Sequence, residues 1–110
     1  MDNPKFKIQR SSDDQFIWNL QAKNGEVILT SERYTTKQSC KIGIDSSKRN
    51  VDERNFKRLV ARNDQYYFVQ IANNNEPIGV SEMYETTYSR DNGIAAVKRD
   101  APVAGVEDAT

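Results

Sequence analysis

The chain has 110 residues, enough for one compact domain, and its 16 basic residues balance 16 acidic ones. This balance argues against a dominant electrostatic attraction to nucleic acid or to an anionic membrane, and no apolar run approaches the roughly 20 residues of a membrane span. A single cysteine, Cys40, excludes an internal disulfide, and the first five residues lack the pattern of a signal peptide, so we expect a cytoplasmic protein.

The sequence contains an internal repeat. A shift of fifty positions aligns residues 6–50 with residues 56–100 without a gap, and 17 of the 45 aligned pairs are identical. Chance would give about two or three identities, and a repeat at such a period is an architectural unit. The chain therefore predicts one domain over residues 1–110, built from two copies of one unit at residues 5–50 and 55–100.

The first unit begins with three predicted strands at residues 6–10, 15–22 and 26–31, and the first two alternate apolar and polar residues. Turn-forming residues separate them at 11–14 and at Asn24-Gly25. A two-residue turn at 24–25 would place Val27 and Leu29 beside Leu20. A three-residue loop with Gly25 in the left-handed conformation would place Ile28 there instead. We favour the second register, because it keeps the isoleucine that both copies share on the same face of the sheet.

A helix is predicted after the third strand. Thr36 is the expected N-cap, and the face expected to be buried contains Cys40, Gly43, Ile44 and Ser47. The second unit repeats the plan, with strands at 56–61, 66–72 and 76–81 and Thr86 as N-cap of a helix whose matching face contains Arg90, Gly93, Ile94 and Val97. We expect residues 1–4 to be frayed and the tail over residues 101–110 to be loosely held.

These patterns predict an α+β fold in which tandem β-β-β-α repeats form one antiparallel sheet with the helices packed on one face. The side covered by the helices should contain Phe16, Trp18, Leu20, Ala22, Ile28, Tyr66, Phe68, Ala72, Ile78 and Val80. The opposite, uncovered side should carry Ile17, Val27, Leu29, Tyr67, Val69 and Ile71. A contiguous apolar patch of this kind is typical of an interface, although such residues also suit strands without any partner.

The two copies share the pattern Phe-x-Trp-x-Leu-x-Ala-x-Asn-Gly-Glu-x-Ile-x-x-Ser-Glu-x-Tyr followed by Gly-Ile. This pattern resembles the small bacterial YegP-like proteins of the DUF1508 / UPF0339 group over about residues 5–100. The resemblance implies three strands and a helix per repeat, with two repeats forming one antiparallel sheet, and members with a single repeat are expected to dimerise into the same arrangement. It implies no established activity and no catalytic residues. The sequence departs from the family pattern at Ser47, Gln70, Asn75 and Arg90.

Catalytic chemistry has little support in this sequence. The chain contains no histidine, which removes Ser-His and Cys-His activation of a nucleophile and the commonest metal ligand. Cys40 belongs to the predicted buried helix face, where a free cysteine behaves as a small hydrophobic residue. We therefore expect no enzyme activity, no cofactor and no metal.

Three hypotheses for function follow. The first is a non-catalytic binding module that uses the uncovered sheet face to contact an unknown protein partner or a second copy. The second is a small-ligand or catalytic site at the Ser-Glu-x-Tyr corners, formed by Ser31, Glu32, Tyr34, Ser81, Glu82 and Tyr84, although such corners also suit a strand that turns into a helix. The third is a nucleic-acid platform on Lys5, Lys7, Arg10, Arg54, Lys57, Arg58 and Arg62. The balanced charge favours a solvated surface for these residues, and we expect neither nucleic acid nor membrane as the partner.

Overall fold

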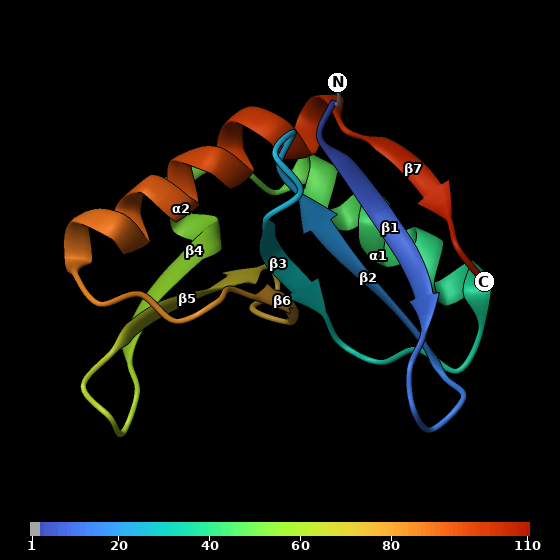
Figure 1. Cartoon of the computed structure of the whole chain (residues 1–110), viewed down its shortest axis with the longest axis horizontal. Coiled ribbons are helices and arrows are strands. Elements are labelled where there is room, and N and C mark those ends of the chain that lie inside the picture. Colours follow the sequence, from blue (N-terminus) through green and yellow to red (C-terminus); the bar gives the residue numbers. More distant parts are fainter. Residues whose placement is uncertain (1–2) are drawn as a thin grey trace.

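The computed structural model describes residues 3–110; the predicted fraying at residues 1–4 therefore lies partly outside the described residues. In residues 3–110 the chain forms a seven-stranded sheet and two α-helices (Figure 1). The elements are β1 (Lys5–Arg10), β2 (Phe16–Gln21), β3 (Val27–Ser31), α1 (Lys37–Arg49), the 3-10 helix η1 (Glu53–Asn55), β4 (Phe56–Val60), β5 (Tyr66–Ile71), β6 (Pro77–Val80), α2 (Thr87–Asp100), the 3-10 helix η2 (Ala101–Val103) and β7 (Gly105–Asp108).

The strand order is β4-β5-β6-β3-β2-β1-β7, so the two repeats lie side by side in one sheet. They meet at β3 and β6, where Thr30 pairs with Val80 and Ser31 with Gly79. The predicted α+β fold of tandem repeats is confirmed. One strand differs from the prediction of an antiparallel sheet, because β7 pairs with β1 in parallel.

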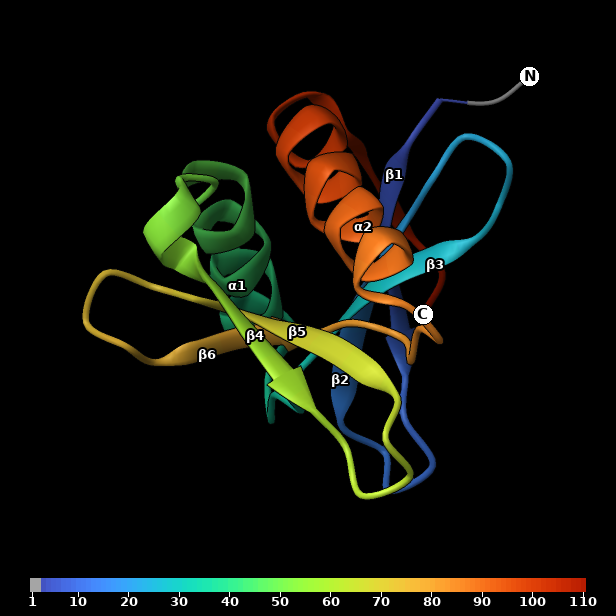
Figure 2. The ribbon, with the colours of Figure 1, turned by 90° about the vertical axis from the view of Figure 1, so that its left-hand side faces the viewer.

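Both helices bridge the two repeats. Helix α1 contacts β2 of its own repeat and β6 of the other, and α2 contacts β5 of its own repeat and β3 of the other. Figure 2 shows the two helices next to each other on one side of β5 and β6. We call the side of the sheet that they cover the inner face, and the opposite side the outer face.

The helix ends agree with the sequence analysis. The hydroxyl of Thr36 accepts a hydrogen bond from the Ser39 N–H at 3.0 Å, and Thr86 accepts one from Ser89 at the same distance. The buried residues of α1 are Cys40, Gly43, Ile44 and Ser47, as predicted. In α2 the buried residues are Gly93, Ile94, Val97 and Asp100, whereas the guanidinium of Arg90 lies over the Tyr66 ring, 5.7 Å from its centroid.

The four hairpins inside the repeats use the same kind of loop. Each ends in a residue with positive φ: Asp14, Gly25, Asp64 and Asn75. In the loop predicted at Gly25, the Ala22 N–H donates to the Glu26 carbonyl at 2.8 Å, so three residues connect β2 to β3. Glycine adopts positive φ at little cost and asparagine tolerates it better than most residues, which explains how Asn75 can replace the glycine of the family pattern.

A bulge in β3 corrects the predicted outer face. Leu20 pairs with Leu29, and not with Ile28 as the favoured register predicted. Gln21 pairs with Val27, so Ile28 is an extra residue in the ladder. Both residues next to the irregularity then turn inward: Ile28 is 7% exposed and Leu29 is completely buried in the core. The prediction that Leu29 lies on the uncovered face is therefore wrong.

The same bulge in β6 corrects a second residue. Gln70 pairs with Gly79 and Ile71 with Pro77, which leaves Ile78 as the extra residue. Val80 consequently pairs with Val69 on the outer face and is 37% exposed. The prediction that Val80 belongs to the face covered by the helices is wrong for the same physical reason.

The tail over residues 101–110, expected to be loosely held, forms η2 and β7 (Figure 1). Ala101 and Ala104 are buried. In the repeat alignment β7 falls where a third copy of the first strand would begin. The chain that leaves α2 returns to the edge of β1, much as the chain that leaves α1 continues into β4 at the opposite edge.

Candidate functional site

The outer face is crossed by a row of paired residues. Lys7 pairs with Asn19, which pairs with Thr30. The row continues from Thr30 to Val80, from Val80 to Val69 and from Val69 to Lys57. Residues that point the same way along β2 and β5 add Ile17, Tyr67 and Ile71. The outer face therefore has an apolar centre with a lysine toward each side.

Four of the six residues predicted for this surface lie there in the expected way. Ile17, Val27, Tyr67 and Val69 are partly exposed. Ile71 points outward by strand alternation but is only 8% exposed, outside the main core cluster. Neither α1 nor α2 packs on this side, and in Figure 1 α1 lies behind β1 and β2.

Two further exposed apolar residues lie in this region and were not predicted there, Val80 and Met83. Met83 is 48% exposed and lines a hollow of about 450 Å³ together with Val27, Ile28 and Tyr84. Glu26 and Glu82 also border this hollow. No local sequence signal identifies Val80, because its direction depends on the bulge at Ile78.

The Ser-Glu-x-Tyr corners have structural roles for their serines. The Ser31 hydroxyl accepts from the Trp18 N–H at 2.9 Å and donates to the Glu32 carbonyl at 2.7 Å. Ser81 makes the matching contacts with the Phe68 N–H and the Glu82 carbonyl. Each serine therefore closes the end of its own strand, and its hydroxyl is already occupied.

The corner tyrosines pack under the helices. Tyr34 pairs through its backbone with Phe16, and its ring lies against Gly43, where an added Cβ would come within 2.7 Å of the ring carbon that bears the hydroxyl. Tyr84 has the same relation to Gly93. Burial raises the pKa of both phenols. These glycines thus allow close approach of helix and sheet, and the tyrosines are packing residues; a ligand at these corners stays a prediction.

The indole of Trp18 is completely buried beside Tyr34. Its Nε1–H has no hydrogen-bond partner of good geometry within residues 3–110. The Tyr34 hydroxyl is nevertheless close, since both groups lie next to the same point over Gly43. We therefore regard Trp18 as a core residue that faces a phenol, and we assign no ligand to it.

The basic residues do not form one surface. Lys5 pairs with Glu107, Arg10 with Asp14, Arg54 with Asp52, and Arg58 with Glu53 and Asp91. β1, which carries Lys5 and Arg10, and β4, which carries Arg58, lie toward opposite edges of the sheet, and Arg54 lies in η1. In the strand ladders Arg10 and Arg58 lie opposite inward-facing residues, whereas Lys7 and Lys57 point outward. This arrangement gives a nucleic-acid platform no continuous basic track.

Chemistry at Cys40 has no support from its surroundings. The thiol is buried, and burial raises its pKa to about 11, so it is a thiol and not a thiolate at neutral pH.

Among residues 3–110, no group of three or more potential metal ligands comes together. Neither helix in this part of the chain is long and apolar enough to cross a membrane.

The family model of a domain of unknown function, DUF1508, matches the chain twice, over residues 11–57 and 61–108. The chain belongs to the DUF1508 family. The two matches correspond to the two repeats, which agrees with the resemblance inferred from the sequence.

Curated relatives in this family carry the name UPF0339. One from Bordetella pertussis is 48% identical over 58 residues, which cover 52% of this chain and 52% of that protein. YegP of Escherichia coli K12 is 53% identical over 45 residues, which cover 41% of each. The matched stretches therefore span about half the length of these curated relatives, or less.

Solved structures of DUF1508 proteins match over nearly the whole chain. The solution NMR structure of YegP from E. coli, described as a protein of unknown function, has a TM-score of 0.92 at 42% identity and covers 100% of this chain and 96% of its own. A UPF0339 protein from Shewanella oneidensis has a TM-score of 0.89, also at 42% identity, with coverage of 96% and 91%. The fold is shared, and no function comes with it.

Proposed function

We propose that this DUF1508 protein is a non-catalytic binding module that contacts a protein partner through the outer face of its sheet. The observation that carries this proposal is the partly exposed apolar centre around Val69, Val80 and Tyr67, on the side where neither helix packs. Exposed apolar patches of this kind are used for protein contacts, and tyrosine is frequent among the residues that contribute most to binding.

The composition of the face favours a protein over a nucleic acid. Tyr67 is the one aromatic side chain in the outward rows of β2 and β5, whereas single-stranded nucleic acids are bound by several stacked aromatics beside a basic groove. Thr30, which lies next to the apolar centre and is partly exposed, offers a hydrogen bond of the kind found at the rim of protein interfaces.

The proposal is tested with Tyr67→Glu and Val69→Glu, which place a charge in the centre of the face. The matched control is Val60→Glu, because Val60 is 60% exposed on β4 but pairs with Tyr66 on the other side of the sheet. We expect a partner recovered from extracts of the native cell by the wild type and by the control to be lost from both outer-face variants. Light scattering of the purified protein tests the alternative that the partner is a second copy.

A strictly monomeric protein whose outer-face variants recover the same proteins as the wild type would exclude this function. Titration with labelled RNA and single-stranded DNA at low salt tests the nucleic-acid hypothesis separately. A salt-dependent affinity that Lys7→Gln or Lys57→Gln weakens would favour the nucleic-acid hypothesis instead.

A further inference from the structure

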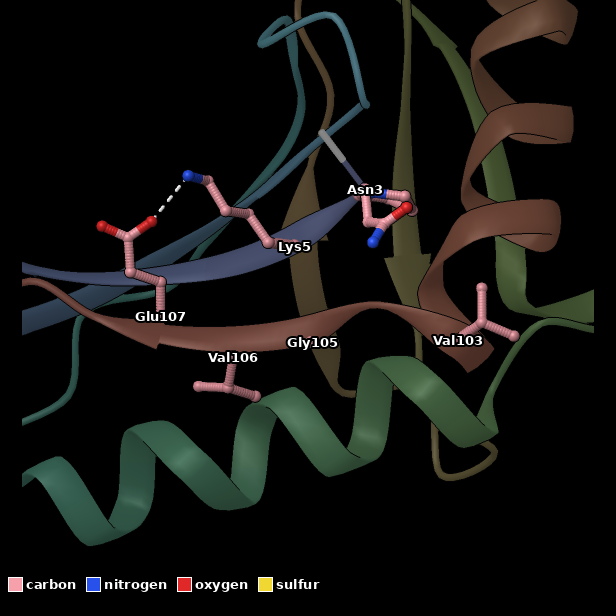
Figure 3. Close-up of a pocket in the computed structure, with 7 residues that line it drawn as sticks. Asn3, Lys5, Val103, Gly105, Val106 and Glu107 are labelled. Carbon is pink, nitrogen blue, oxygen red and sulfur yellow. Dashed lines mark ion pairs between the residues drawn. The ribbon is translucent and has the colours of Figure 1, made fainter. Parts of the chain in front are cut away.

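Strand β7 is held on the edge of β1 by charged side chains. Lys5 of β1 contacts the carboxylate of Glu107 at 2.6 Å (Figure 3), and Lys37, the first residue of α1, donates to Asp108 at 2.9 Å. The two carboxylates belong to neighbouring residues of an extended strand and therefore point to opposite sides. The two lysines hold them from different elements.

Backbone contacts complete this attachment. Lys48, near the end of α1, donates to the Ala104 carbonyl at 2.6 Å, just before the strand begins. At the other end, the Ala109 N–H donates to the Ile8 carbonyl at 2.9 Å. The segment is thus bound along its length as an added parallel strand, with a lysine at its start, a lysine on each side and a backbone hydrogen bond at its end.

Apolar packing contributes little to holding β7. Val106 is 53% exposed and Val103 is 74% exposed. A hollow of about 620 Å³ borders the strand beside Val103 and Asn3 (Figure 3), and another of about 320 Å³ separates Val106 from Lys41 of α1. A segment with few buried apolar contacts opens locally at low cost, and ion pairs between exposed groups are weak and screened by salt.

We propose that the edge of β1, together with Lys5, Lys37 and Lys48, is a binding groove for an extended acidic segment of a protein partner, and that the chain's own residues 105–110 occupy it in the absence of that partner. Addition of a strand to a sheet edge is a common mode of peptide recognition, in which the backbone gives affinity and alternate side chains give specificity. The preferred segment has an apolar residue, Glu and Asp in that order, as Val106, Glu107 and Asp108 have.

The opposite edge of the sheet lacks these features, which makes the groove specific to β1. In the repeat alignment Lys5 corresponds to Asn55 and Lys37 to Thr87, neither of which carries a charge. Lys98, which corresponds to Lys48, is already bonded to Glu53 at 2.8 Å. Lys5 and Glu107 point to the same side of the sheet as Lys7, but they lie at its edge, away from the apolar centre around Val69 and Val80. The proposal does not depend on the function proposed for the outer face.

Hydrogen exchange of the full chain tests whether β7 detaches. We expect the amides of residues 106–109 to exchange about tenfold faster, or more, than those of the buried residues of β2, and to accelerate further when NaCl is raised. Lys37→Gln should increase this local exchange. The control Lys57→Gln removes an exposed lysine from the opposite edge strand, β4, and should not. Amides of β7 as protected as those of β2, and insensitive to salt, would overturn the proposal.

Binding in trans tests the recognition. In the full-length variant Glu107→Lys/Asp108→Lys the tail is repelled from the groove, and we expect this variant to bind a synthetic peptide of residues 103–110. The wild type should bind the same peptide about tenfold more weakly, because its attached tail competes at an effective concentration in the millimolar range. NMR shifts should appear at Phe6, Lys7 and Ile8.

Two results of the binding experiment would overturn the proposal. One is that a folded Glu107→Lys/Asp108→Lys variant fails to bind the peptide. The other is that it binds equally well a peptide with both acidic residues replaced by lysine. A dimer formed by exchange of tails between two copies would assign the groove to self-association and would also overturn it. If the variant does not fold, the exchange experiment on the wild-type chain decides.

Discussion

At the scale of single residues, two departures from the DUF1508 pattern compensate each other. Ser47 of α1 donates a hydrogen bond from its hydroxyl to the side-chain oxygen of Gln70 in β5 at 2.7 Å, and the Gln70 amide donates to the Asn50 carbonyl at 2.7 Å. The corresponding positions of the other half are occupied by Val97 and Leu20, both completely buried. A hydrogen-bonded polar pair thus replaces an apolar pair at equivalent places in the core.

We predict that Ser47→Val and Gln70→Leu each lower the free energy of unfolding by about 1–3 kcal/mol, because each leaves a buried polar partner unsatisfied. The double variant should recover most of this loss, since it recreates the apolar pair of the other half. Urea denaturation of the four proteins in a double-mutant cycle measures the coupling. Additive losses would show that the two side chains act independently.

The sequence identified both departures but not their relation. Ser47 and Gln70 belong to different repeats, and they meet because α1 reaches beyond its own three strands into the other half. Leu29 illustrates the same limit. Its direction is set by a bulge that one chain's alternation pattern does not reveal.

At the scale of elements, the helices follow from local sequence. Thr36 and Thr86 have extended backbone conformations and satisfy an N–H of the first helical turn, and the predicted face of α1 is the buried one. Such features depend on neighbours within a few positions, which is why sequence patterns predict them. The hairpin loop at Gly25 was predictable for the same reason.

We predict that Thr36→Ala and Thr86→Ala each lower the free energy of unfolding by about 1 kcal/mol, because an N–H at the helix start loses its partner. Thr35→Ala is the control, because Thr35 is also an exposed threonine but lies one position before the cap. Thermal or urea unfolding gives the comparison. An effect at Thr35 as large as that at Thr36 would argue against capping as the cause.

At the scale of the whole molecule, the two repeats join through a narrow junction. Gly79 of β6 pairs with Ser31 of β3. A Cβ at position 79 would lie 2.9 Å from Leu29 Cγ and 3.0 Å from the Thr30 carbonyl oxygen. Leu29 and Gly79 are equivalent positions of the two repeats, so a large side chain in one copy occupies the space that its counterpart leaves free.

We predict that Gly79→Ala lowers the free energy of unfolding by about 1–3 kcal/mol, because the Thr30 backbone has to move to admit the methyl group. Gly105→Ala is the matched control, because nothing lies within 4 Å of an added Cβ there. Denaturant midpoints of the two variants give the test. Equal stabilities would show that the junction can relax freely.

An exposed ion-pair network links α2 to the second repeat's first strand and predicts a pH dependence. Hydrogen bonds from Lys98 and Arg58 lower the pKa of Glu53 to about 2, below its unfolded value of about 4.3. Its stabilising contribution is therefore complete above about pH 5 and is lost as the pH falls toward 2. We expect the urea midpoint to fall over this range, and Glu53→Gln to weaken the dependence.

The control for this experiment is Glu82→Gln, an exposed carboxylate to which no ion pair within residues 3–110 is joined. Its pH profile should follow the wild type. High salt should reduce the effect of Glu53→Gln, because exposed ion pairs are screened. If the urea midpoint of Glu53→Gln depends on pH in the same way as that of the wild type, Glu53 does not contribute to the loss of stability in acid.

The sequence by itself determined the duplicated unit, the order of its strands, the caps and buried faces of its helices and the loop at Gly25. All of these depend on residues close together in the chain or on comparison of its two copies. The tertiary structure decided that Leu29 is buried, that Ser47 bonds to Gln70 and that β7 joins β1 in parallel. The burial of Leu29 depends on a bulge between β2 and β3. The other two features depend on how the repeats meet, because the partners of these residues are supplied by the other repeat or by the segment that follows it.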